Sequence, residues 1–95
     1  MNNPTRNIHK AYRLGLKPVK IEPDDRQRIG WILQNHSNTA TGATIYLSSG
    51  GAYTQNACLR IMDGENANED ILAPSQDLWA FSDVDGAVLT VILKY

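Results

Sequence analysis

The sequence predicts an all-β protein, a small antiparallel β-sandwich of jelly-roll type with an extended N-terminal arm. Short runs in which apolar and polar residues alternate recur along the chain, and turn-forming residues separate them. The 95 residues suffice for one modest core. We therefore expect two parts, a basic arm over residues 1–20 and a sandwich domain over residues 21–95.

The clearest strand signals lie between Arg28 and Gly50, on both sides of a polar loop at 35–42. Apolar residues there occupy every second position, which predicts strands over 26–35 and 43–48. We expect these strands to form an antiparallel pair at the middle of the sandwich. The alternating apolar residues are Ile29, Trp31, Leu33, Ile45 and Leu47.

Further strands are predicted on either side of this pair. Residues 16–22 contain Pro18, which cannot donate a ladder hydrogen bond, so this segment is expected at a sheet edge or in the arm. Asp85-Gly86 predicts a hairpin turn. The closing strand, 87–95, is apolar on both faces, as in a central strand or a subunit interface. The remaining strands are expected over 57–62 and 78–82.

The predicted core follows from the same alternation. Its members are Ile29, Trp31, Leu33, Ile45, Leu47, Leu59, Ile61, Trp79, Phe81, Leu89, Val91 and Leu93.

The charge is distributed unevenly. Residues 1–20 hold five basic residues and no acid, whereas the rest of the chain holds four basic residues and all ten acids. This asymmetry indicates an arm that binds an acidic surface; a solvated, disordered arm is the alternative. Deleting residues 1–15 should then leave the fold intact. The acidic body disfavours nucleic acid as a partner.

No pattern of catalytic or metal-ligating residues stands out, and we expect neither an enzyme nor a cofactor. His9 and His36 are far apart in sequence, and Cys58 is the single cysteine, which disfavours zinc and excludes an intrachain disulfide. No Gly-x-Ser-x-Gly motif is present. The acidic runs at 63–66 and 83–86 lack the spacing of a calcium loop and are interpreted as turns.

Two further expectations concern membranes and glycans. No apolar run approaches the roughly 18 residues that a membrane-spanning helix needs, and the N-terminus lacks the apolar stretch of a secretory signal. The aromatic residues are expected mainly in the core and at an interface, with a sugar-stacking platform as the alternative. They are Trp31, Tyr46, Tyr53, Trp79, Phe81 and Tyr95.

The order of these motifs over residues 26–95 resembles small β-sandwich structural proteins of tailed bacteriophage virions. The shared cadence consists of Arg28-Ile29 through Asn35 with Ser37, Ile45-Tyr46-Leu47, Gly50-Gly51, Asp63-Gly64-Glu65, Leu78 through Asp83, and Lys94-Tyr95. The chain departs from the family in its longer arm and in Asp63, where a proline is typical.

The resemblance implies a virion protein assembled in the host cytoplasm, a head decoration (cement) protein that binds the major capsid protein or another virion protein. A carbohydrate-binding, fibre or neck module is the alternative. We expect a homo-oligomer, with a trimer favoured. The arm and the outward residues of the last strand are the expected partner-binding sites, namely Arg6, Lys10, Tyr12, Arg13, Lys17, Val88 and Ile92.

Overall fold

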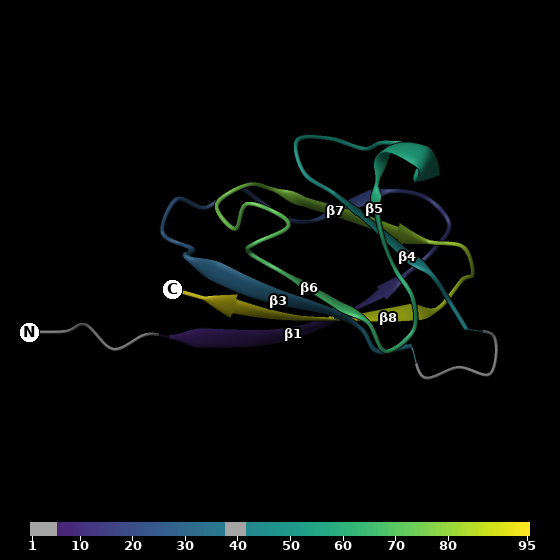
Figure 1. Ribbon diagram of the computed structural model, residues 1–95, viewed down its shortest axis with the longest axis horizontal. Coiled ribbons are helices and arrows are strands. Elements are labelled where there is room, and N and C mark those ends of the chain that lie inside the picture. Colours follow the sequence, from purple (N-terminus) through teal and green to yellow (C-terminus); the bar gives the residue numbers. More distant parts are fainter. Residues whose placement is uncertain (1–5, 38–41) are drawn as a thin grey trace, which may run out of the picture.

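The computed structural model describes residues 6–37 and 42–95 as two four-stranded antiparallel sheets packed face to face (Figure 1). Residues 1–5 of the expected arm and residues 38–41 of the expected polar loop lie outside the described residues. The elements are β1 (Asn7–Leu14), β2 (Val19–Glu22), β3 (Gly30–Asn35), β4 (Ile45–Ser48), the 3-10 turn η1 (Gln55–Ala57), β5 (Leu59–Ile61), β6 (Asn66–Asn68), β7 (Leu78–Ser82) and β8 (Ala87–Lys94).

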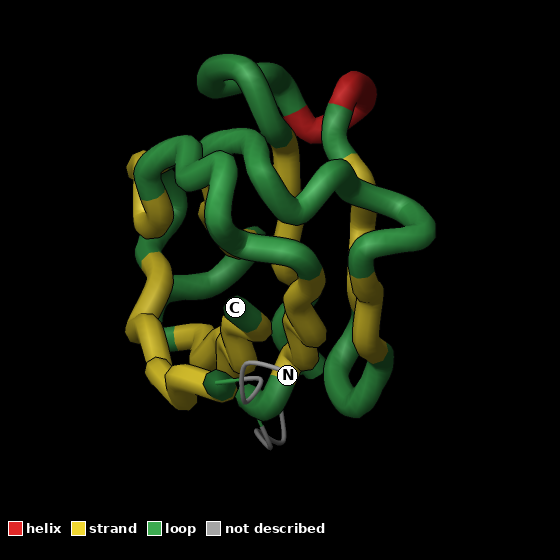
Figure 2. The backbone as a smooth tube through the Cα atoms, turned by 90° about the vertical axis from the view of Figure 1, so that its left-hand side faces the viewer, coloured by secondary structure: helices red, strands yellow, loops and turns green. Residues whose placement is uncertain are grey.

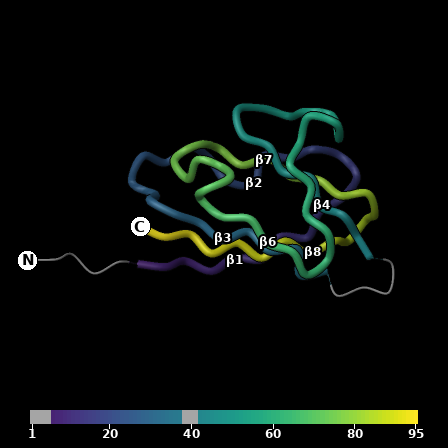
Figure 3. The backbone as a smooth tube through the Cα atoms, viewed as in Figure 1, coloured from purple at the N-terminus to yellow at the C-terminus, as the bar shows by residue number. Residues whose placement is uncertain are grey.

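The strand order is that of a jelly roll. Sheet 1 has the order β1-β8-β3-β6, and sheet 2 has the order β2-β7-β4-β5. The chain changes sheet at every connection except the one between β4 and β5, which carries η1 (Figures 2 and 3). The predicted fold class, a small antiparallel β-sandwich, is confirmed.

The predicted strand pairings are wrong at two places. β3 lies in sheet 1 and β4 in sheet 2, so the strands on both sides of the polar loop are not partners. The Asp85-Gly86 turn also connects different sheets, because β7 belongs to sheet 2 and β8 to sheet 1. A period of two fixes which face of a strand is buried, but it carries no information about the neighbouring strand.

The inner faces of the two sheets form the core. Most of the predicted core residues lie there, and Leu59 packs against it at the margin. The prediction that Ile29 belongs to the core is wrong, since this residue precedes β3 and is 60% exposed. On β7 the core was predicted to contain Trp79 and Phe81, but Leu78 and Ala80 are the residues that point inward. Core residues that were not predicted are Leu14, Ala43, Ala67, Leu78, Ala80 and Ala87.

Residues 7–14 form a strand of the sandwich rather than an arm outside it. β1 pairs with β8 over its whole length, from Asn7 opposite Lys94 to Leu14 opposite Ala87. Leu14 is buried in the core, and Ile8 and Tyr12 pack against it. The expected boundary at residues 20 and 21 falls within β2, which is an edge strand as Pro18 predicted. The sequence did not predict β1 because the charged Lys10 interrupts the apolar residues that face inward along this strand.

Within the described ranges, the structure contains no helix with the length and apolar character that crossing a membrane requires.

Candidate functional site

A buried carboxylate lies where β1 packs over β2. Glu22 is only 2% exposed. The Lys10 ammonium lies 3.0 Å from Glu22 Oε2, and the Tyr12 hydroxyl donates a hydrogen bond to the same oxygen. Burial, together with this hydrogen bond, raises the pKa of Tyr12 above its ordinary range. Lys10 and Tyr12, two of the expected partner-binding residues, therefore point into the sandwich.

Arg28 completes this cluster and ties two loops together. Its guanidinium donates to the backbone carbonyls of Pro23 at 3.0 Å and Gln76 at 2.7 Å, and it lies 3.9 Å from Glu22. The guanidinium also packs 4.9 Å from the centre of the Trp31 ring. Since Arg28 and Glu22 are both buried and their polar atoms are engaged, we assign the cluster a structural role.

The outer face of sheet 1 gathers three of the expected partner-binding residues. Arg13 is opposite Val88 across β1 and β8, and Ile92 lies opposite Ile32 on β3. Their neighbours along each strand point into the core, so these four side chains face outward. Ile32 is 47% exposed. We use "outer face" below for the surface centred on Arg13, Ile32, Val88 and Ile92.

A hollow lies at one end of this outer face. Gly30 stands opposite Lys94 and contributes no side chain, and a Cβ atom there would come within 3.2 Å of the Glu69 carboxylate. The hollow combines three apolar residues with one polar and two charged residues. It is lined by Asn7, Trp31, Ile32, Glu69, Ile92 and Lys94.

The other two expected residues lie apart from the outer face. The Arg6 guanidinium packs 5.3 Å from the centre of the Tyr95 ring, where the two backbones also exchange hydrogen bonds. Lys17 is exposed in the connection between β1 and β2. Of the seven residues, the structure thus brings together Arg13, Val88 and Ile92.

The outward side of sheet 2 is occupied by contacts within the chain. The rings of Tyr46 and Phe81 stack with their centres 5.0 Å apart, and the Lys20 ammonium lies 5.8 Å from the centre of the Trp79 ring. Asp77 accepts hydrogen bonds from the Gly50 amide at 2.6 Å and the Trp79 indole at 2.9 Å. These two bonds lower the pKa of Asp77.

A second, more polar hollow borders the Tyr46–Phe81 pair, and its lining is Tyr46, Gln55, Asn56, Cys58 and Arg60. Trp31 is buried in the core and Tyr95 lies at the end of sheet 1. The aromatic residues therefore do not form one continuous platform.

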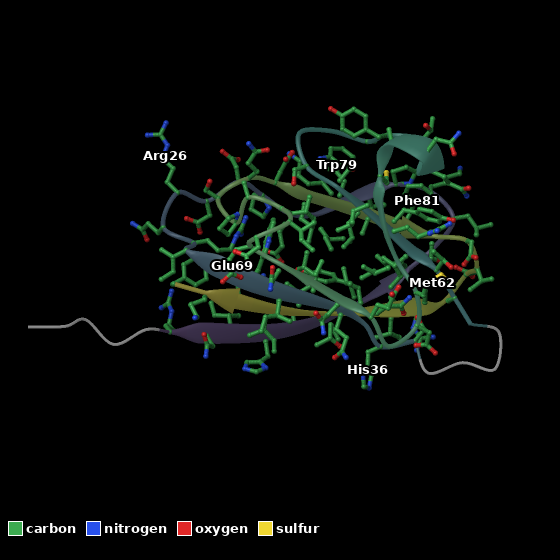
Figure 4. The ribbon with its side chains drawn as sticks, viewed as in Figure 1. Arg26, His36, Met62, Glu69, Trp79 and Phe81 are labelled. Atoms are coloured by element: carbon green, nitrogen blue, oxygen red, sulfur yellow. The ribbon has the colours of Figure 1, made fainter. Side chains whose placement is uncertain are left out.

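The side chains capable of nucleophilic, acid–base or metal-binding chemistry are dispersed. His36 projects from the side of sheet 1 (Figure 4), and burial raises the pKa of the Cys58 thiol. In the first acidic run Glu65 accepts the Met62 amide within its own turn, whereas in the second run Asp83 accepts the Thr44 amide from the residue before β4. Among residues 6–37 and 42–95, no three His, Cys, Asp or Glu side chains are grouped to hold a metal ion.

Comparison with solved structures bears on the fold. No protein-family model and no curated protein matches the chain. A solved structure from a study of Bacillus endospore appendages, described as a family of disulfide-linked pili, superposes with a TM-score of 0.54 and 14% identity. The match covers 97% of this chain and 86% of the other. At this identity the likeness supports the fold alone.

Proposed function

We propose that the chain is a non-enzymatic structural subunit that binds a larger protein particle through the outer face of sheet 1. The observation that carries the proposal is the pair Ile32 and Ile92, which lie opposite each other on β3 and β8 and line the hollow in that face. An apolar centre with a polar and charged rim is the usual anatomy of a protein interface.

The surroundings of this pair fit such a contact. Val88 adds a second apolar side chain on the outward side of β8, with Thr90 between it and Ile92, and Arg13 lies beside Val88 on β1. At the other end, the hollow over Gly30 offers a recess in which a partner's side chain would fit between Lys94 and Glu69. The strands β3 and β8 are held by a continuous ladder of six register pairs, which makes the surface rigid before it binds.

The particle that we propose is a tailed-phage virion, and the partner is its major capsid protein. This assignment rests on the motif cadence over residues 26–95. A sandwich fold shared with a protein of pilus-like appendages is compatible with a structural role.

A second candidate function is glycan binding at the polar hollow on sheet 2. One observation favours it, the Tyr46 ring that Phe81 holds in place beside two amide side chains and Arg60. Aromatic rings and amides are groups to which sugars bind. A glycan array with the wild type and a Tyr46→Ala variant tests this function, and the absence of any hit would exclude it.

The main proposal is tested by incorporation into particles. We would express the wild type and an Ile32→Thr/Ile92→Thr variant in the phage host and measure their copy number in purified virions. Threonine retains β-branching and removes apolar area, so the fold should persist. The matched control is Arg60→Thr, a substitution on sheet 2.

We expect the control to be incorporated as the wild type is, and the double variant to be reduced at least tenfold. If a folded double variant enters virions at the wild-type level, the outer face is not the binding surface. If the wild type is absent from purified virions, the virion assignment fails.

A further inference from the structure

We propose that copies of this chain associate head to tail, with the free edge of β1 in one copy pairing with the free edge of β6 in the next. β1 and β6 are the two edge strands of sheet 1, separated by β8 and β3 (Figure 1). This contact uses the edge strands of the sheet, so it leaves the residues of the outer face on β3 and β8, namely Ile32, Val88 and Ile92, available for a particle. It is independent of the proposed function.

The hydrogen-bonding pattern of β1 shows which of its backbone groups point outward. Arg6 and Tyr95 exchange both backbone hydrogen bonds, at 3.1 and 2.8 Å. Bonded and non-bonded pairs alternate along an antiparallel ladder, so the N–H and C=O groups of alternate residues point away from β8. These residues are Asn7, His9, Ala11 and Arg13, which makes β1 a long edge on which another strand can add.

The edge at β6 is shorter than the edge at β1 and offers fewer free backbone groups. The Asn35 amide donates to Glu65 at 3.0 Å, so by the same alternation the backbone groups of Asn66 and Asn68 point away from β3. The Asn68 carbonyl accepts the amides of Ile71 and Leu72 in the turn that follows. The Asn66 N–H and C=O and the Asn68 N–H therefore face the neighbouring copy.

Charge makes the two edges complementary. Residues 1–21 contain no acid, and β1 with its flank presents Arg6 and Arg13, while the charge of Lys10 is paired with Glu22. Residues 61–93 contain no Lys or Arg, and β6 is flanked by the exposed carboxylates of Glu65 and of Glu69 and Asp70.

Pairing of β1 with a second β1 would oppose like charges, whereas pairing with β6 opposes unlike charges. Because the two edges lie on opposite sides of one sheet, each added copy exposes a new edge. Such a contact is heterologous, and repeated addition yields a ring or a filament.

A complementary charge swap tests this geometry. One variant carries Arg6→Glu and Arg13→Glu on the basic edge, and the other carries Glu65→Lys and Asp70→Lys on the acidic edge. Lys10 is left unchanged because it is bonded to Glu22. Sedimentation velocity at low ionic strength would be measured for the wild type, for each variant alone and for their equimolar mixture.

We expect the wild type to form species larger than a dimer, each variant alone to be monomeric, and the mixture to regain large species. Regained assembly also shows that both variants are folded. A monomeric wild type, an acidic-edge variant that still assembles alone, or a mixture that stops at the dimer would each overturn the proposal. The last two results would indicate a β1–β1 contact.

A backbone substitution gives a second test that does not depend on charge. The Ala11 N–H points to the free edge, so Ala11→Pro removes a donor from that edge and leaves the β1–β8 ladder bonds in place. We expect a folded monomer. Wild-type assembly by this variant would show that the β1 edge is not used.

Discussion

The two sheets differ in what covers the side that faces away from the core. On sheet 2 the aromatic residues are engaged within the chain, through the Tyr46–Phe81 stack and the contacts of Trp79 with Lys20 and Asp77. On sheet 1, Ile32 remains 47% exposed and lies beside Ile92 and a hollow. Apolar surface that a chain does not cover itself is the surface on which a partner gains most. This difference is why we propose that the outward side of sheet 2 stabilises the sandwich and that sheet 1 binds a partner.

The largest expected effect lies at the cluster on which both sheets depend. Arg28→Ala would leave the buried Glu22 carboxylate and the carbonyls of Pro23 and Gln76 short of a donor. We expect the free energy of unfolding to fall by about 3–5 kcal/mol, measured by urea denaturation. A loss below about 1 kcal/mol would mean that water replaces the guanidinium and that the cluster does not hold the sheets together.

The next prediction compares the two outward sides directly. Phe81→Ala on sheet 2 should lower the free energy of unfolding by about 3 kcal/mol, because Phe81 is buried against Tyr46. Ile32→Ala on sheet 1 should cost less than about 1 kcal/mol, because that side chain is half exposed. If parallel urea titrations showed equal losses of unfolding free energy for the two variants, the proposed difference in role between the two sheets would be contradicted.

A smaller effect depends on pH and concerns the contact of β1 with β2. The pKa of Tyr12 is raised above the ordinary value of 10.0, first by burial and then by the hydrogen bond to Glu22. Above pH 10 the unfolded chain releases this proton while the folded chain retains it, so the free energy of unfolding falls as pH rises. Tyr12→Phe should lose less stability than the wild type over this range. Identical pH profiles would contradict a buried, bonded hydroxyl.

The smallest effect concerns Cys58, on the side of sheet 2. Burial raises the pKa of its thiol, so a smaller fraction of the thiol is in the reactive thiolate form at a given pH. Iodoacetamide should modify the folded protein more slowly than a free cysteine, and a reductant should leave self-association unchanged. Reductant-sensitive assembly would indicate instead that copies are linked by disulfides.

The sequence predicted the fold class and most of the core, because alternation along β3, β4, β5 and β8 reports directly which face is buried. It failed at β7, where the buried face carries the small Ala80 and the aromatic residues pack on the outside. It also failed at β1, where Lys10 interrupts the apolar series. A charge is accommodated there because its ammonium is paired with Glu22 on β2 and its side chain remains 42% exposed.

The candidate surface was predictable only in part. Val88 and Ile92 were identified because β8 is apolar on both faces. Ile32 was not, since its position next to Ile92 depends on the pairing of β3 with β8, which joins residues far apart in sequence. The Glu22–Arg28 cluster was not predicted either, because its partners on β1 and in the loop before β7 are distant along the chain.

The division between the sheets is tested most directly by hydroxyl-radical footprinting of the protein bound to its particle, compared with the free protein. We expect Ile32 and Ile92 to be protected on binding, while the reactivities of Tyr46 and Tyr53 on the side of sheet 2 stay unchanged. Protection of Tyr46 and Tyr53 with Ile32 and Ile92 as reactive as in the free protein would contradict the assignment of sheet 1 as the side for assembly.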